Sequence, residues 1–104
     1  MRSSSTLKLL LLTCLLSACA VRLPQPSAAD AKHGFAGVGL DELKQGRVLY
    51  IARCGGCHAL RDPDSEPAAA WSREVHEMRT KNGVALSDEE ERWISAYLIA
   101  IASR

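Results

Sequence analysis

The apolar residues of this chain recur at helical spacing, which predicts an all-α fold. A first helix is expected over residues 40–53, with one face formed by Leu43, Gly46, Tyr50 and Cys54. A last helix of about fifteen residues is expected after Ser87, which forms a capping box with Glu90. Its single apolar stripe consists of Trp93, Ile94, Tyr97, Leu98 and Ile101. We expect these two helices to cross, with Gly46 allowing their backbones to approach closely.

A helix between these two is predicted over residues 68–80. Trp71, Val75 and Met78 share one face of it, at positions i, i+4 and i+7. The preceding segment contains Pro63 and Pro67, which suit a turn-rich passage and not a helix.

The start of the chain has the pattern of an export signal over residues 1–18. Arg2 and Lys8 flank a polar start, and the apolar run that follows is too short to span a bilayer as a stable anchor. The run ends in Leu16-Ser17-Ala18-Cys19, which resembles the lipobox of bacterial lipoproteins. That resemblance implies cleavage before Cys19, a lipid on its sulfur, and a domain anchored at the periplasmic side of a bacterial membrane. An ordinary cleavage after Ala20, which releases a soluble periplasmic protein, and an uncleaved anchor are the alternatives.

The segment from residue 19 to residue 39 is predicted to be a flexible linker. It contains Pro24, Pro26, several alanines and three glycines, a composition that buries too little apolar surface to order itself. His33 lies in it and is interpreted as a solvated residue. The domain organisation expected is therefore a signal over 1–18, a lipidated N-terminus and linker over 19–39, and a folded domain over 40–104.

The chain length and the net charge exclude some classes of function. The whole chain has 104 residues and a formal net charge of +1, so nothing favours nucleic acid as a partner. The length also excludes large catalytic folds such as a (β/α)₈ barrel. A domain as small as residues 40–104 is marginal without a disulfide, a metal or a cofactor to complete its core.

The run Cys54-Gly55-Gly56-Cys57-His58 is the C-x-x-C-H pattern of c-type haem attachment. At this spacing, two thiols can add to the two vinyl groups of one haem, and the adjacent imidazole can lie beneath the iron. The same C-x-x-C spacing also occurs in dithiol redox proteins and zinc sites. A thioredoxin-like dithiol should follow a strand, whereas a helical pattern comes before this one.

A zinc site is the weaker alternative for this motif. Structural zinc takes four ligands, usually in two closely spaced pairs. Beyond the motif only His33 and His76 remain as histidines, and neither has a neighbouring cysteine or histidine.

Taken together, residues 40–104 resemble a small monohaem class I cytochrome c. The resemblance rests on Gly46-x-x-x-Tyr50-x-x-x-Cys54, on the haem-attachment motif and on the closing helix with Tyr97-Leu98. It implies roughly three to four helices around one covalently attached haem c, with the first and last helices crossing. Gly46 is then expected against Tyr97, with Trp93 able to share the contact. Cys54 and Cys57 would hold the haem, with His58 as the proximal iron ligand.

In that family a methionine sulfur normally completes the iron on the distal side. Met78 is the only methionine beyond the signal, so it is the expected distal ligand. His76 is the rival, but it lies on the opposite helix face beside charged residues. An open iron is the third possibility, because the interval from His58 to Met78 is short for the family.

The resemblance implies a one-electron carrier and not an enzyme, although membership of an oxidoreductase complex stays open. Redox proteins are the expected partners, with a membrane reached through the lipid and no small-molecule substrate. An open-iron haem enzyme or gas sensor, and a haem-free dithiol protein, are the alternatives. The expected apolar wall of the haem site consists of Trp71, Val75, Leu60 and Leu86. Four basic residues lie near these segments in the sequence: Arg53, Arg61, Arg79 and Lys81. They could steer an acidic partner, pair with haem propionates or simply be solvated.

Overall fold

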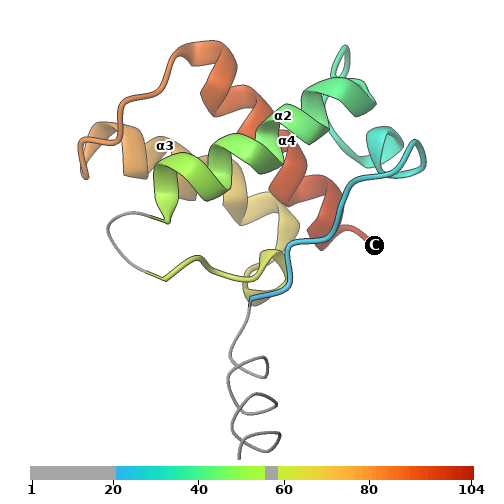
Figure 1. Cartoon of the computed structure of the whole chain (residues 1–104), viewed down its shortest axis with the longest axis horizontal. Helices are drawn as coiled ribbons and strands as arrows, with labels where there is room; N and C mark the ends of the chain where they lie inside the picture. Colours follow the sequence, from blue (N-terminus) through green and yellow to red (C-terminus); the bar gives the residue numbers. More distant parts are fainter. Residues whose placement is uncertain (1–20, 56–58) are drawn as a thin grey trace, which may run out of the picture.

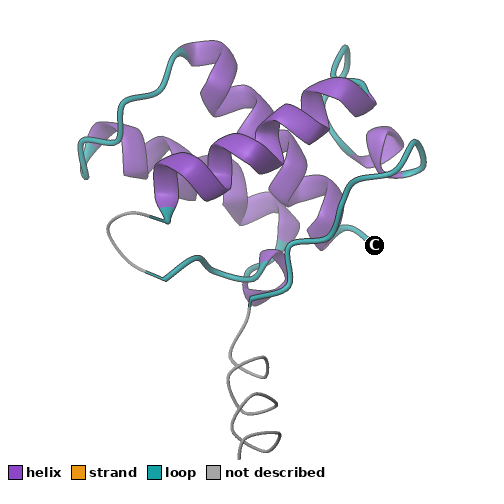
Figure 2. Cartoon of the chain, in the orientation of Figure 1, coloured by secondary structure: helices purple, strands orange, loops and turns teal. Residues whose placement is uncertain are grey.

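The structure, a computed structural model, describes residues 21–55 and 59–104. Its longest elements are the helices α2 (Leu40–Leu49), α3 (Trp71–Thr80) and α4 (Asp88–Ala102). Shorter helical turns lie between them: η1 (Asp30–His33), the π-helical η2 (Tyr50–Cys54), η3 (Pro63–Ser65) and η4 (Ala68–Ala70). Figure 2 shows helices and loops only in this described part of the chain, which confirms the all-α prediction.

The first predicted helix forms from α2 and η2, which follow each other without a break from Leu40 to Cys54. Its apolar face is buried as the spacing predicted, from Leu43 at 0% exposed to Cys54 at 7%. The last turn is π-helical, a widening that is frequent at functional sites. The face that carries Cys54 therefore continues the face that packs in the core.

The last helix begins where the capping box places it. The Ser87 hydroxyl accepts a hydrogen bond from the Glu90 backbone N–H at 3.1 Å, and the Glu90 carboxylate accepts one from the Ser87 N–H at 3.0 Å. Ile94, Tyr97 and Leu98 are completely buried. α4 is thus the central helix, in contact with α2 on one side and with α3 on another.

Figure 1 shows that α2 crosses α4, and Gly46 of α2 lies against α4 at Trp93 and Tyr97. A β-carbon built on Gly46 would lie 2.1 Å from the backbone oxygen of Trp93 and 3.1 Å from the β-carbon of Tyr97. The predicted close approach is confirmed, and both Trp93 and Tyr97 take part in it. Only glycine fits at this point of contact, since the nearest opposing atoms, the carbonyl carbon and oxygen of Trp93, belong to backbone.

The expected flexible linker is wrong for the part that the structure describes. Residues 21–38, which we call the N-terminal strap, run along α2 and α4 and include buried residues such as Pro26 and Val38. The Leu23 carbonyl accepts a hydrogen bond from Arg47 Nε at 2.8 Å, and the Pro24 carbonyl accepts one from the Tyr97 hydroxyl at 2.8 Å. Strap carbonyls bonded to distant side chains order this segment, despite its composition. The folded unit therefore includes residues before 40.

A partly buried ion pair joins the strap to Arg104. Both oxygens of Asp30, which is 4% exposed, accept hydrogen bonds from Arg104 at 2.9 and 2.7 Å. The Ser27 N–H and hydroxyl bind the same carboxylate. These bonds, the one from Arg104 above all, hold the pKa of Asp30 well below its ordinary value.

Replacing Gly46 by alanine should destabilise the protein, although alanine is the better helix former. The new β-carbon would overlap the Trp93 carbonyl, so the helices must separate, at a cost of about 1–3 kcal/mol. Urea unfolding of Gly46→Ala measures this, with Gln45→Ala on the exposed side of α2 as the control, which we expect within about 0.5 kcal/mol of the parent. An unchanged midpoint for Gly46→Ala would mean that the helices cross elsewhere.

Asp30→Asn should lower the free energy of unfolding by about 1 kcal/mol at neutral pH, since the partner Arg104 is partly exposed. A depressed pKa contributes stability that is complete above the unfolded value of about 3.9 and is lost as pH falls through the folded value. The difference between parent and variant should therefore persist at pH 7 and shrink below about pH 4. Urea titrations across this range test it, with exposed Asp41→Asn as the control. A difference that is independent of pH would argue against the ion pair.

Candidate functional site

A mostly apolar cavity lies between η2, α3 and α4. Its lining residues are Tyr50, Cys54, Arg61, Trp71, Glu74, Val75, Met78 and Leu98. Cys54 and Met78, two of the predicted site residues, thus line the same cavity from different elements. Cys57 and His58 lie outside the described residues, as does Cys19.

Cys54 is the last residue of η2 and is 7% exposed. The chain turns away directly after it at Gly55, where a β-carbon would lie 2.8 Å from the backbone oxygen of Ile51. A side chain at this position would clash with the helix end, so the first glycine of the motif is explained by backbone packing. The exit of the chain at Gly55 leaves Cys54 on the cavity side.

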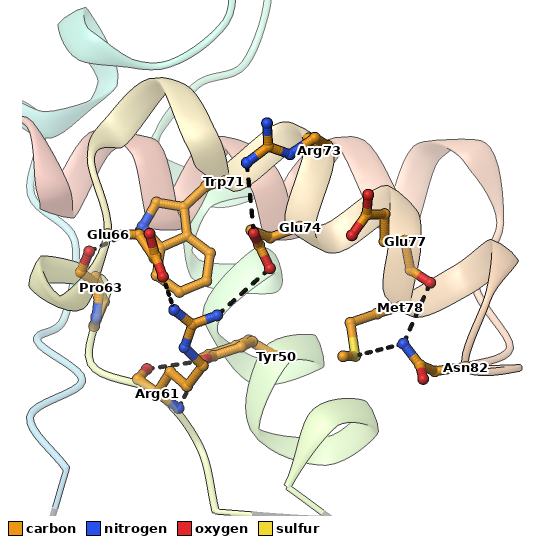
Figure 3. Close-up of polar contacts among 10 residues, drawn as sticks. All are labelled: Tyr50, Arg61, Pro63, Glu66, Trp71, Arg73, Glu74, Glu77, Met78 and Asn82. Atoms are coloured by element: carbon orange, nitrogen blue, oxygen red, sulfur yellow. Dashed lines mark hydrogen bonds and ion pairs between the residues drawn. The ribbon is translucent and has the colours of Figure 1, made fainter.

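Met78 occupies the cavity-facing side of α3, one turn beyond Val75. The side chain is half-buried, and the Asn82 amide nitrogen lies 3.7 Å from its sulfur (Figure 3). Trp71 and Val75, on the same face, are 3% and 4% exposed. The helix face predicted from the spacing of these three residues is therefore the face that lines the cavity.

His76, the rival ligand, points away from this face. Its side chain is 60% exposed, and Nδ1 lies 2.6 Å from a carboxylate oxygen of Glu91 on α4. The same carboxylate binds Arg79 at 2.8 Å. His76 belongs to an ion-pair group between α3 and α4 and not to the cavity lining.

Two aromatic side chains fix the chain segment over the cavity. The Tyr50 hydroxyl donates to the Arg61 carbonyl at 2.8 Å and accepts from the Arg61 N–H at 3.0 Å. Trp71 Nε1 donates to the Pro63 carbonyl at 2.9 Å, as Figure 3 shows. Burial raises the pKa of Tyr50, which keeps its hydroxyl neutral and able to donate. Residues 61–63 therefore have a fixed path past the cavity.

The Arg61 and Glu74 side chains are the charged part of the wall. The Arg61 guanidinium lies 5.3 Å from the centre of the Trp71 ring and pairs with Glu66 and Glu74 (Figure 3). The Arg61 side chain is 40% exposed, so these ion pairs are largely solvated and weak. The Arg61 side chain is therefore held only weakly, in contrast to its backbone, which Tyr50 holds.

The donor chemistry of the cavity fits a haem, whereas its present volume requires movement of the wall. A cysteine thiol and a methionine thioether face one apolar space, which suits covalent attachment and soft iron ligation. The cavity is open on one side, and its volume of about 40 Å³ is far too small for a porphyrin. Displacement of the Arg61 side chain, which only partly exposed ion pairs hold, would enlarge the cavity without disturbing the crossing of α2 and α4.

Sequence reasoning identified part of this lining. Of the expected wall residues, Trp71 and Val75 line the cavity, while Leu86 is buried elsewhere in the core and Leu60 packs beside Gly55. Glu74 was missed, although it lies between Trp71 and Met78 on the same helix face. Helical spacing alone could have found it.

The other basic residues near the motif are engaged within the chain. Arg53 donates to the Ala85 carbonyl at 2.6 Å and pairs with Glu90, Arg79 binds Asp88 and Glu91, and Lys81 pairs with Glu77. Their contacts are therefore with carboxylates and a carbonyl of this protein.

Two further features bear on the expectations from the sequence. Across residues 21–55 and 59–104, no three His, Cys, Asp or Glu side chains are grouped as a metal ion would need. Within the same ranges, no helix combines the length and apolar character that crossing a membrane takes.

Comparison of the chain with protein-family models, curated proteins and solved structures finds no match in any of the three.

Proposed function

We propose that this protein is a one-electron carrier with a single covalently bound haem c, anchored by a lipid at the periplasmic side of a bacterial membrane. The observation that carries the proposal is that Cys54 and Met78 line one apolar cavity. Cys54 and Cys57 would hold the haem through thioether bonds, and His58 and Met78 would ligate its iron. The lipid anchor, on Cys19, rests on the sequence of the N-terminus.

The geometry of Met78 supports its role as the distal ligand. A ligand sulfur must approach from an element other than the one that carries the thioether cysteines, and α3 meets this condition. His76, on the same helix, is turned toward Glu91. The Met78 side chain is thus the better placed of the two candidates.

The role of the protein in electron transfer would be to hold its ligands still and to keep water out. A bound haem would supply the redox centre, and thioether ligation favours a higher potential than harder ligands do. Met78 lies on a helix anchored by Trp71, and Cys54 lies on a helix anchored at Gly46. With both axial positions taken by side chains, no position for a substrate would remain. Outer-sphere transfer of one electron is the activity that follows.

Covalent haem is the first expectation to test. Expressed with a c-type maturation system, the protein should retain a haem stain on a denaturing gel and gain the mass of one haem, because thioether bonds survive detergent. The double variant Cys54→Ser/Cys57→Ser should lose both signals, while Ser65→Ala, an exposed control, keeps them. A colourless parent protein would favour the dithiol alternative.

Met78→Ala should lower the reduction potential by tens to hundreds of mV, within the roughly 0.8 V over which axial ligands tune haem. It should also let the reduced protein bind CO, because it removes the sulfur that fills the distal position. His76→Ala is the matched control and should change neither property. If His76→Ala produced these changes and Met78→Ala did not, the distal assignment would be reversed.

Cys19→Ser should move the protein from the membrane fraction to the soluble periplasmic fraction, because the acylated thiol is lost. Cys14→Ser, in the apolar run of the signal, is the matched control and should stay in the membrane. Membrane retention of Cys19→Ser would contradict the lipid anchor.

A further inference from the structure

The N-terminal strap is bound to the helices almost from its first described residue. Three consecutive carbonyls, those of Leu23, Pro24 and Gln25, accept hydrogen bonds from Arg47, Tyr97 and Arg104, respectively. The Asp30–Arg104 ion pair holds the next part of the strap. The polypeptide is therefore part of the folded unit from Leu23 onward.

This attachment leaves little chain for a lipid tether. From Cys19 to Leu23 there are four residue steps, which span about 14 Å at most. A free linker over residues 19–39 would instead reach about 70 Å when extended, and about 25 Å on average as a random coil. Order in the strap thus shortens the tether about fivefold in maximum reach.

The first two residues of the strap have side chains that can interact with the surface of a bilayer. Val21 is 38% exposed and is one of few large apolar side chains exposed in the described chain. Arg22, next to it, is also exposed. An apolar side chain can enter the headgroup region beside an acyl chain, and an arginine near an anionic membrane surface contributes about 1 kcal/mol of attraction.

We propose that the domain lies directly against the bilayer, with the N-terminal end of the strap, at Val21 and Arg22, and the C-terminal end of α4 facing the lipid. This inference rests on the lipid at Cys19 in the proposed function. The surface around Val21 and Arg22 would then contact lipid. Redox partners would then have to reach the domain at the membrane surface, because a tether of four residues does not let it travel far from the bilayer.

The proposal predicts which end of the molecule lies nearer the bilayer. α4 is about 22 Å long, and the Gln25 carbonyl accepts a hydrogen bond from Arg104, two residues beyond the C-terminal end of this helix. In Figure 1 the strap begins at the lower edge of the molecule, whereas α4 begins at the upper edge. A label at Gln25 should therefore lie nearer the bilayer than a label at Glu89, in the first turn of α4. Both side chains are exposed and accept a label without disturbing the core.

The experiment uses full-length, lipidated, haem-loaded protein in vesicles of phosphatidylcholine and phosphatidylglycerol that carry nickel-chelating lipids. A nitroxide is attached to Gln25→Cys or to Glu89→Cys, and the iron is kept reduced. Enhancement of nitroxide relaxation by the nickel at the headgroups should be several-fold greater at position 25 than at position 89. A flexible Gly/Ser insertion of about twelve residues between Val21 and Arg22 adds about 40 Å of reach and should abolish that difference. The same insertion appended after Arg104 is the matched control and should preserve it.

Flotation with the vesicles separates the two ways in which the idea can fail. Protein that does not float with the vesicles contradicts the lipid anchor, and with it this inference. Protein that floats but shows equal relaxation at both positions leaves the anchor standing and overturns the inference. Persistence of the difference after the Val21–Arg22 insertion would likewise overturn the role of the short tether.

Discussion

The contact between Gly46 and the backbone of α4 sets the geometry of everything that follows along the chain. Because the Trp93 carbonyl would lie 2.1 Å from a β-carbon at Gly46, the two helix axes are closer there than any other residue would allow. Cys54 lies eight residues further along, about 12 Å by helical rise. The crossing therefore fixes where Cys54, the first residue of the C-x-x-C-H motif, lies relative to α4. α3 packs on α4 as well, so both sulfur-bearing elements are positioned by the same central helix.

Much of this architecture could be predicted from the sequence, since its signals are local. The Ser87–Glu90 capping box defines the start of α4 with four residues, and the spacing of Trp71, Val75 and Met78 identifies the face of α3 that lines the cavity. Helical periodicity reports which residues share a face because it depends only on near neighbours. That is why the helices and the cavity-facing methionine were found without knowledge of the packing.

The strap shows what such signals cannot reveal. Its alanines, prolines and glycines predict disorder, yet its carbonyls meet Arg47, Tyr97 and Arg104, which lie 24, 73 and 79 residues away along the chain. Composition measures how much apolar surface a segment can bury by itself, and backbone acceptors are the same in every sequence. The donors that order the strap are ordinary surface and core side chains until the fold brings them together. The same reasoning applies to residues 61–63, which Tyr50 and Trp71 hold in place.

The strength of the contacts around the cavity determines which part of its wall would move most easily. The helices α2, which leads directly to Cys54, and α3, which carries Met78, pack on α4, and separating them from it would cost several kcal/mol of core contacts. The Arg61 side chain is held by half-exposed ion pairs, which contribute about 0–1 kcal/mol each. A large planar cofactor would therefore be admitted by movement on the Arg61 side. α2 and α3 would keep the positions that their packing on α4 gives them.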